Sequence, residues 1–200
     1  VMADFIISRS NKGFNFILKR SVSSTLIDEL APFAKFNSVT FEENKSKVIG
    51  MISSTNEKLK AFAKNDHFST YVYILSNKTM PDASISYENW EAGNKILGNY
   101  FLESDDIGKF RPLELNYDKL RVSFDKGCYR GQEIVARMKY LGIDRRSFLT
   151  FITSNEFDAS EDIKIVGQKI EIDDKYVFNG IVKKDLIPDI QNDPQILKII

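Results

Sequence analysis

The sequence predicts an α+β fold whose C-terminal part consists mainly of β-strands. Up to about residue 146, runs with the two-residue period of strands alternate with runs that have helical spacing. From Phe148 onward, short β-rich runs separated by turn-forming residues replace the helical spacing. We therefore expect two units, an α+β region at residues 1–146 and a small antiparallel barrel or sandwich at residues 147–200.

The first unit is predicted to begin with a β-hairpin. Residues 2–8 and 14–20 are strand-like, and the turn between them contains Asn11 and Gly13, which tolerate positive φ angles. The chain opens directly in this pattern and does not begin with Met, so we expect a fragment whose preceding segment, including any targeting sequence, is not readable.

Helices and strands then alternate through the rest of the first unit. The predicted helices are residues 21–36, 54–66 and 86–101, and the predicted strands are residues 38–43, 47–53 and 70–76. Ser23 or Ser24 is the expected N-cap of the first helix, and the second helix is expected to turn Leu59 and Phe62 inward. The predicted strands of the second unit are residues 148–154, 162–172, 175–184 and 195–200.

Composition narrows the class of protein. The 28 acidic and 28 basic residues balance, which argues against bulk binding to nucleic acid or to a membrane surface. One cysteine cannot form an internal disulfide, and no run approaches the roughly 20 apolar residues of a membrane span. We therefore expect an intracellular, soluble protein with no nucleic-acid or membrane partner.

Positive charge is concentrated in one segment. Residues 109–147 carry ten Lys and Arg against five Asp and Glu, whereas residues 148–200 carry six against ten. Two interpretations stay open for the basic segment: it binds an anionic ligand, or it is a solvated basic face.

The motif KGCYRGQE, residues 126–133, lies within this basic segment. It places the only cysteine, Cys128, between Lys126 and Arg130 and just before a helix predicted to begin at Gly131, run through Ile134, Val135 and Met138 at core spacing, and end at Gly142. A positive helix end and two cations favour a reactive thiolate. The alternative is a small buried hydrophobic side chain, which free cysteine often is.

Glu133 also has two interpretations. It stands four residues before Arg137, a favourable spacing for a surface ion pair on a helix. Together with the Gln132 amide, its carboxylate can instead accept hydrogen bonds from a planar heterocycle that has adjacent N–H donors. No metal site is expected, because one cysteine and one histidine, His67, cannot supply four ligands.

The motif resembles the K-G-C-Y-x-G-Q-E sequence of the YgfZ family at all seven fixed positions. The flanking segments at residues 112–120 and 137–146 also resemble that family. YgfZ proteins are folate-binding proteins, related in fold to the aminomethyltransferase (T-protein) of the glycine cleavage system, that help iron–sulfur proteins to mature. The resemblance therefore implies a T-protein-like folate-binding fold that ends in a small antiparallel β-barrel.

The resemblance also implies a ligand and its binding residues. The ligand is tetrahydrofolate or a one-carbon derivative, and the implied binding residues are Asn116, Tyr129, Arg130, Gln132 and Glu133. Cys128 is implied as a reactive thiol at the rim of the folate pocket, assisted by Lys126. Iron–sulfur client or assembly proteins are the implied transient partners, and the bacterial cytoplasm or the mitochondrial matrix is the implied location.

Three classes of function follow from the resemblance. The first is an accessory protein, not itself an enzyme, that binds tetrahydrofolate and serves the assembly or repair of iron–sulfur proteins. The second is a folate-dependent aminomethyltransferase. The third is a thiol or interaction module without folate binding. The chain departs from the family at residues 98–100, where Gly-Asn-Tyr replaces the frequent Gly-Ile-Pro. From the resemblance we also expect that the first part of the family domain, where T-proteins carry a catalytic aspartate, is not within these 200 residues.

Overall fold

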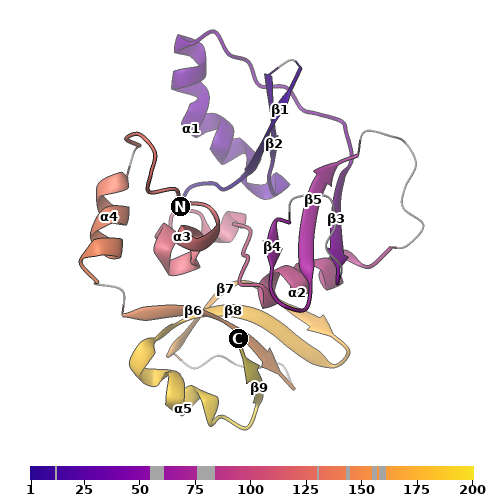
Figure 1. Ribbon diagram of the computed structural model, residues 1–200, viewed down its shortest axis with the longest axis vertical. Helices are drawn as coiled ribbons and strands as arrows, with labels where there is room; N and C mark the ends of the chain where they lie inside the picture. Colours follow the sequence, from indigo (N-terminus) through magenta and orange to yellow (C-terminus); the bar gives the residue numbers. More distant parts are fainter. Residues whose placement is uncertain are drawn as a thin grey trace.

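The computed structural model confirms a mixed arrangement of helices and antiparallel sheets (Figure 1). The structure describes residues 1–11, 13–54, 61–75, 84–129, 131–142, 145–154, 157 and 161–200. Among these residues, no helix is long and apolar enough to cross a membrane.

The predicted hairpin and first helix are confirmed. Strands β1 (Ile6–Ser10) and β2 (Gly13–Ile17) pair antiparallel, and a short 3₁₀ helix, η1 (Arg20–Val22), leads into α1 (Ser23–Phe36). The expected serine N-cap is wrong: the cap position is Val22, with no side-chain hydrogen bond. The Ser23 hydroxyl donates instead to the Arg20 carbonyl, at 2.7 Å, because η1 already supplies the preceding turn.

A three-stranded antiparallel sheet follows, in the order β3-β5-β4. It consists of β3 (Val48–Ser53), β4 (Ala63–Lys64) and β5 (Ser69–Ile74), and α2 (Tyr87–Ile96) follows it in the chain. The strand predictions at residues 47–53 and 70–76 are confirmed at their cores. The Ser86 hydroxyl accepts a hydrogen bond from the Asn89 N–H and caps α2.

Two predictions in this region are wrong. Residues 61–66, expected to continue a helix, contain β4, because the Phe62 N–H and the β4 backbone pair with β5. The first part of that predicted helix, with Leu59, lies outside the described residues. Residues 38–43 form no strand: Ser38 has a φ of +54°, which turns the chain away from α1, and Val39 is exposed.

Short helices connect α2 to the C-terminal sheet. These are η2 (Ser104–Asp106), η3 (Pro112–Leu115), α3 (Tyr117–Leu120) and α4 (Gln132–Tyr140). In Figure 1, α3 lies near the centre, α4 on the left, and α2 with its sheet on the right.

The predicted strand-rich tail is confirmed as a four-stranded antiparallel sheet in the order β7-β8-β6-β9. The strands are β6 (Arg146–Thr153), β7 (Ile163–Ile172), β8 (Lys175–Lys183) and β9 (Ile196–Ile199). Between β8 and β9 lie η4 (Lys184–Leu186) and α5 (Ile187–Gln191), which the sequence did not predict. The order leaves β7 and β9 as the edges of the described sheet, so these strands do not close into a barrel.

The main hydrophobic core joins the two predicted units. Tyr100, Leu102 and Leu115 from the first unit pack with Phe148 and Ile181 from the second. Gly167 of β7 has a φ of +66° and leaves no room for a Cβ, which would lie 2.6 Å from the Tyr100 ring. The boundary at residue 146 therefore matches the start of a strand, while the core continues across it.

Candidate functional site

The motif loop leads into α4 at the outer edge of the molecule. Gly131 is the N-cap of α4 with a φ of +85°, a left-handed conformation that glycine adopts without strain. Cys128 is exposed, which excludes the interpretation of a buried hydrophobic side chain. The Lys126 ammonium lies 4.2 Å from the centre of the Tyr129 ring. Arg130 lies outside the described residues.

One contact within the motif and one with neighbouring residues hold the motif loop in place. The Gln132 side-chain oxygen accepts a hydrogen bond from the Tyr129 N–H at 3.2 Å. Tyr129 packs against the cluster formed by Leu113, Val135 and Met138. The expected core spacing holds for Val135 and Met138, but Ile134 is exposed, because only one side of α4 faces η3.

Glu133 pairs with Arg137 on the surface of α4. The oxygen and nitrogen lie 2.6 Å apart, and the two side chains are 75% and 66% exposed. This geometry is the ion pair that the i, i+4 spacing indicates. The binding role of Gln132 and Glu133 stays a prediction, and neither residue lines the two cavities described below.

An aromatic cavity of about 370 Å³ lies between the end of β2, the β3–β5 pair and α2. We define it by its lining residues: Ile17, Leu18, Lys19, Arg20, Ser21, Val48, Val72, Tyr87, Trp90 and Phe101. The Trp90 ring centre lies 6.0 Å from that of Tyr87 and 5.6 Å from that of Phe101. Gly50 lies directly beneath the indole, since a Cβ there would come within 2.5 Å of it. The cavity thus offers flat apolar walls.

A buried network of charges stands at one wall of the aromatic cavity. The Lys19 ammonium contacts the Glu91 carboxylate at 2.5 Å and the Glu103 carboxylate at 2.6 Å. Burial alone lowers the pKa of Lys19, but the hydrogen bonds that its ammonium donates to Glu103 and Glu91 outweigh burial and raise the pKa above its ordinary value. Burial also raises the pKa of Tyr87, to about 12. These lysine and tyrosine side chains therefore keep their protons at neutral pH.

Trp90 adds an unused hydrogen-bond donor. Its Nε1 atom is buried and has no partner among the described residues. A buried donor without an acceptor costs on the order of 1–3 kcal/mol.

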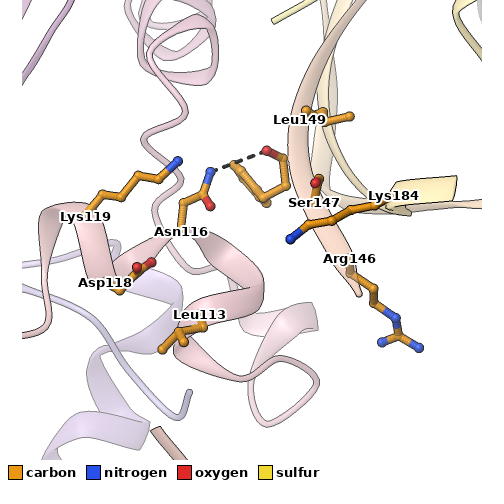
Figure 2. A pocket seen from close by; sticks show the side chains of 9 residues that line it. Leu113, Asn116, Asp118, Lys119, Arg146, Ser147, Leu149 and Lys184 are labelled. Carbon is orange, nitrogen blue, oxygen red and sulfur yellow. Dashed lines mark hydrogen bonds between the residues drawn. The ribbon is translucent and has the colours of Figure 1, made fainter. Parts of the chain in front are cut away.

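A second, polar cavity of about 310 Å³ contains Asn116 (Figure 2). It is lined by Leu113, Asn116, Asp118, Lys119, Arg146, Ser147, Phe148, Leu149 and Lys184. Asn116 has a φ of +54° and donates from its side-chain amide to the Phe148 carbonyl at 3.4 Å. Of the predicted binding residues that the structure describes, Asn116 alone lines one of the two cavities.

The structure separates the motif from the aromatic cavity. In Figure 1, α4 lies on one side of α3, and α2 with the β3–β5 pair lies on the other. The sequence analysis missed Lys19, Tyr87, Glu91 and Phe101, since no motif joins residues from such distant parts of the chain. The aromatic pattern of Trp90 with Tyr87 at helical spacing is the one available indication in the sequence.

The fold and these cavities define an α+β protein with an aromatic candidate ligand site and a separate exposed cysteine. No protein-family model matches the chain. The chain is 28% identical over 171 residues to an uncharacterized protein of Haemophilus influenzae, an alignment that covers 82% of this chain and 58% of that protein.

Two further relatives carry a name. The chain is 26% identical to the tRNA-modifying protein YgfZ of Escherichia coli strain SMS-3-5, with 96% of this chain and 74% of the relative covered. It is 28% identical to the same protein of strain UMN026, with 78% and 59% covered. The chain thus spans little more than half the length of two of these three relatives. The resemblance to the YgfZ family is confirmed, and the chain is a homologue of these proteins.

Proposed function

We propose that this chain is a tetrahydrofolate-binding accessory protein for the assembly or repair of iron–sulfur proteins. The observation that carries the proposal is the homology to YgfZ proteins, joined to a cavity lined by three aromatic rings. A T-protein-like folate-binding fold is part of the proposal.

The aromatic cavity suits the flat parts of a folate. A pterin ring and an aminobenzoyl ring are planar and largely apolar on their faces, so they stack favourably on Trp90, Tyr87 and Phe101. Its volume lies at the lower end of the range for small-molecule sites, which is about 300–1,000 Å³. We therefore assign the ring system, rather than the whole folate, to this cavity.

Polar groups beside the cavity match the edge of a pterin. The ring has adjacent N–H donors, and we propose the carboxylates of Glu91 and Glu103 as their acceptors. Both carboxylates contact the ammonium of Lys19, which lines the cavity, although neither glutamate lines the cavity itself. When bound, the folate supplies a reduced ring that carries one-carbon units; this chain's residues bind and orient it.

The exposed Cys128 suits contact with a partner rather than storage of a cluster. Iron–sulfur clusters are commonly held by about four thiolates. This chain has one cysteine, so it cannot hold an all-cysteine cluster within one subunit. We propose that Cys128, with Lys126 beside Tyr129, contacts a client protein during assembly or repair. The relatives' name links them to tRNA modification, so enzymes of tRNA modification are the first clients to test.

Calorimetry tests whether the chain binds tetrahydrofolate. We expect saturable binding to the 200-residue chain, and we expect Trp90→Leu to weaken it at least about tenfold, a loss of about 1.4 kcal/mol. Phe33→Leu, which changes an exposed aromatic residue on α1, is the matched control and should leave the affinity unchanged. No binding to the chain contradicts the proposal.

An aminomethyl-transfer assay separates the accessory role from the alternative enzyme. Binding without transfer is the expected result, whereas transfer makes the chain a folate-dependent aminomethyltransferase.

Complementation in cells that lack the native protein tests whether the Cys128 thiol is needed for the proposed function. Cys128→Ser should bind tetrahydrofolate normally but fail to restore iron–sulfur enzyme activity, and Lys126→Ala should show a milder defect. Full rescue by Cys128→Ser would place the function in the folate site alone.

A further inference from the structure

Phe101, which lines the aromatic cavity, is held in place through the backbone of both of its chain neighbours. The Arg121 guanidinium donates a hydrogen bond to the Tyr100 carbonyl at 2.6 Å. The Asp4 carboxylate accepts a hydrogen bond from the Leu102 N–H at 3.0 Å. Arg121 and Asp4 contact each other at 2.6 Å. One ion pair therefore binds the backbone immediately before and immediately after Phe101.

The Arg121 guanidinium also lies against the Phe101 ring. Its central carbon is 5.2 Å from the centre of that ring. The Phe62 ring stacks on the same ring, with the two centres 5.1 Å apart. A cation near an aromatic face is attracted to the ring. The place of the Phe101 ring thus depends on contacts to its side chain as well as to its backbone.

Arg121 itself has little freedom to move. A second nitrogen of its guanidinium donates to the side-chain oxygen of Asn99 at 2.8 Å, and its central carbon lies 4.3 Å from the centre of the Tyr117 ring. The side chains of Arg121 and Asp4 are both largely buried. Because the guanidinium is a rigid planar fork of donors, several acceptors around it fix its orientation.

The same network reaches α2, the helix that carries Trp90. The Asn99 side-chain amide donates to the Asn94 side-chain oxygen at 2.7 Å, and the Asn94 amide donates to the Trp90 carbonyl at 2.9 Å. Both asparagines are 1% exposed. Two buried amides therefore connect the guanidinium that holds Phe101 to the backbone of Trp90, which forms another wall of the aromatic cavity.

We propose that Arg121 and Asp4 are positioning residues of the aromatic site, which place the Phe101 ring against Trp90 before a ligand arrives. The Trp90 and Phe101 ring centres lie 5.6 Å apart, with the rings inclined by 33°. Walls that are fixed before binding lose less conformational freedom when a flat ring stacks on them. This inference rests on the proposed folate-ring site and deepens it, since neither positioning residue lines the cavity itself.

Arg121→Lys tests the placement of the Phe101 ring. Lysine keeps the positive charge beside Asp4, but one ammonium does not reproduce the planar fork that binds Tyr100 and Asn99. Without ligand, acrylamide should quench the emission of Trp90, the only tryptophan, more strongly in this variant than in the unchanged protein. Tetrahydrofolate affinity, measured by calorimetry, should fall roughly two- to tenfold, as for the loss of one well-placed aromatic contact.

Asp4→Asn provides a second variant of the same pair. Asparagine still offers an oxygen to the Leu102 N–H, but it lacks the negative charge that holds the guanidinium. The same increase in Trp90 quenching is expected. Circular dichroism checks that each variant is folded, and either folded variant is sufficient for the test.

Two controls identify an effect that is merely structural. Arg145→Lys makes the same substitution at an exposed position that does not line the aromatic cavity. Phe151→Leu lowers stability from the fully buried core of the C-terminal sheet, also outside that cavity. Neither control should change the quenching of Trp90 or the affinity for tetrahydrofolate.

The quenching measurement separates this inference from the folate proposal, because it needs no ligand. Increased quenching confined to the Arg121 and Asp4 variants supports the positioning role whether or not tetrahydrofolate binds. Absence of tetrahydrofolate binding to the unchanged chain contradicts the folate proposal alone. Quenching equal to that of the Phe151→Leu control in a folded Arg121 or Asp4 variant would overturn the positioning role.

Discussion

The motif surface and the interior around α2 differ in how their residues come together. The motif surface, residues 126–133 with α4, is contiguous in sequence and exposed, and its Glu133–Arg137 pair lies in solvent. The interior around α2 joins Lys19 to Glu91 and Glu103, which lie 72 and 84 residues further along the chain, in a largely buried network. The contiguous region is therefore easy to recognise in the sequence, whereas the network around α2 is not.

The largest change in the free energy of unfolding is expected when the buried charge of Arg121 is removed. Its guanidinium contacts the Asp4 carboxylate at 2.6 Å, and both side chains are largely buried. Burial already raises the pKa of Asp4, so loss of the arginine leaves a costly unpaired group. Arg121→Met should lower the free energy of unfolding by about 3–5 kcal/mol in urea titrations.

Arg137→Met is the control for this prediction. The Arg137 pair with Glu133 is exposed, and its loss should cost no more than about 0.5 kcal/mol. Similar losses in the two variants would remove the distinction between the buried and exposed regions.

Replacing Lys95 is expected to cause the next largest change in the free energy of unfolding, and here the change is an increase. It is 2% exposed in α2, and its ammonium has no hydrogen-bond partner among the described residues. Burial lowers its pKa to about 8, with the Lys19 charge acting in the same direction and with Glu91, Glu103 and Asp106 opposing.

The pH dependence follows from this lowered pKa. Between pH 8 and 10.5 the unfolded chain still holds the Lys95 proton and the folded chain has lost it, so stability should rise with pH across this window. At pH 7, Lys95→Met should be more stable than the unchanged protein by up to about 3 kcal/mol. The advantage should shrink as the pH approaches 10.5, and an advantage that does not change with pH would contradict the account.

The sequence predicted the parts of the fold that depend on local periodicity. The short β-rich runs of β6, β7 and β8 and the helical spacing in α1 were sufficient, because these patterns involve residues that are close in sequence. The predictions that were wrong depended on tertiary pairing.

β4 and the serine cap illustrate this limit. Ala63 and Lys64 extend along β5 even though the segment around them has helical spacing, since β5 offers unpaired backbone groups. Ser23 fails to cap α1 because η1 precedes it. The cavities could not be predicted from local patterns either, because Lys19 and Phe101 line the same cavity from distant parts of the chain.

A smaller effect is expected for the surface pair of the motif. Glu133→Ala and Arg137→Ala should each lower the free energy of unfolding by about 0.2–0.5 kcal/mol, since each removes the same exposed contact. Tetrahydrofolate affinity, measured by calorimetry, should be equal in the two variants. A fall in affinity confined to Glu133→Ala would instead establish the predicted role of Glu133 as a folate ligand.

The smallest expected effect concerns access to Cys128. Because the thiol is exposed, iodoacetamide should alkylate it in the folded protein at a rate close to that in the unfolded chain. Mass spectrometry measures the rate in both states. Alkylation that begins only after denaturation would show that the motif loop is buried, and Cys128 could not contact a client.

Fluorescence of Trp90 tests the central claim most directly, because Trp90 is the only tryptophan of the chain and lines the aromatic cavity. Tetrahydrofolate should change its emission in a saturable titration whose dissociation constant equals the calorimetric value, with N-acetyltryptophanamide correcting for light absorbed by the folate. Calorimetric binding with no change in Trp90 emission would contradict the account, since the folate would then bind elsewhere on the chain.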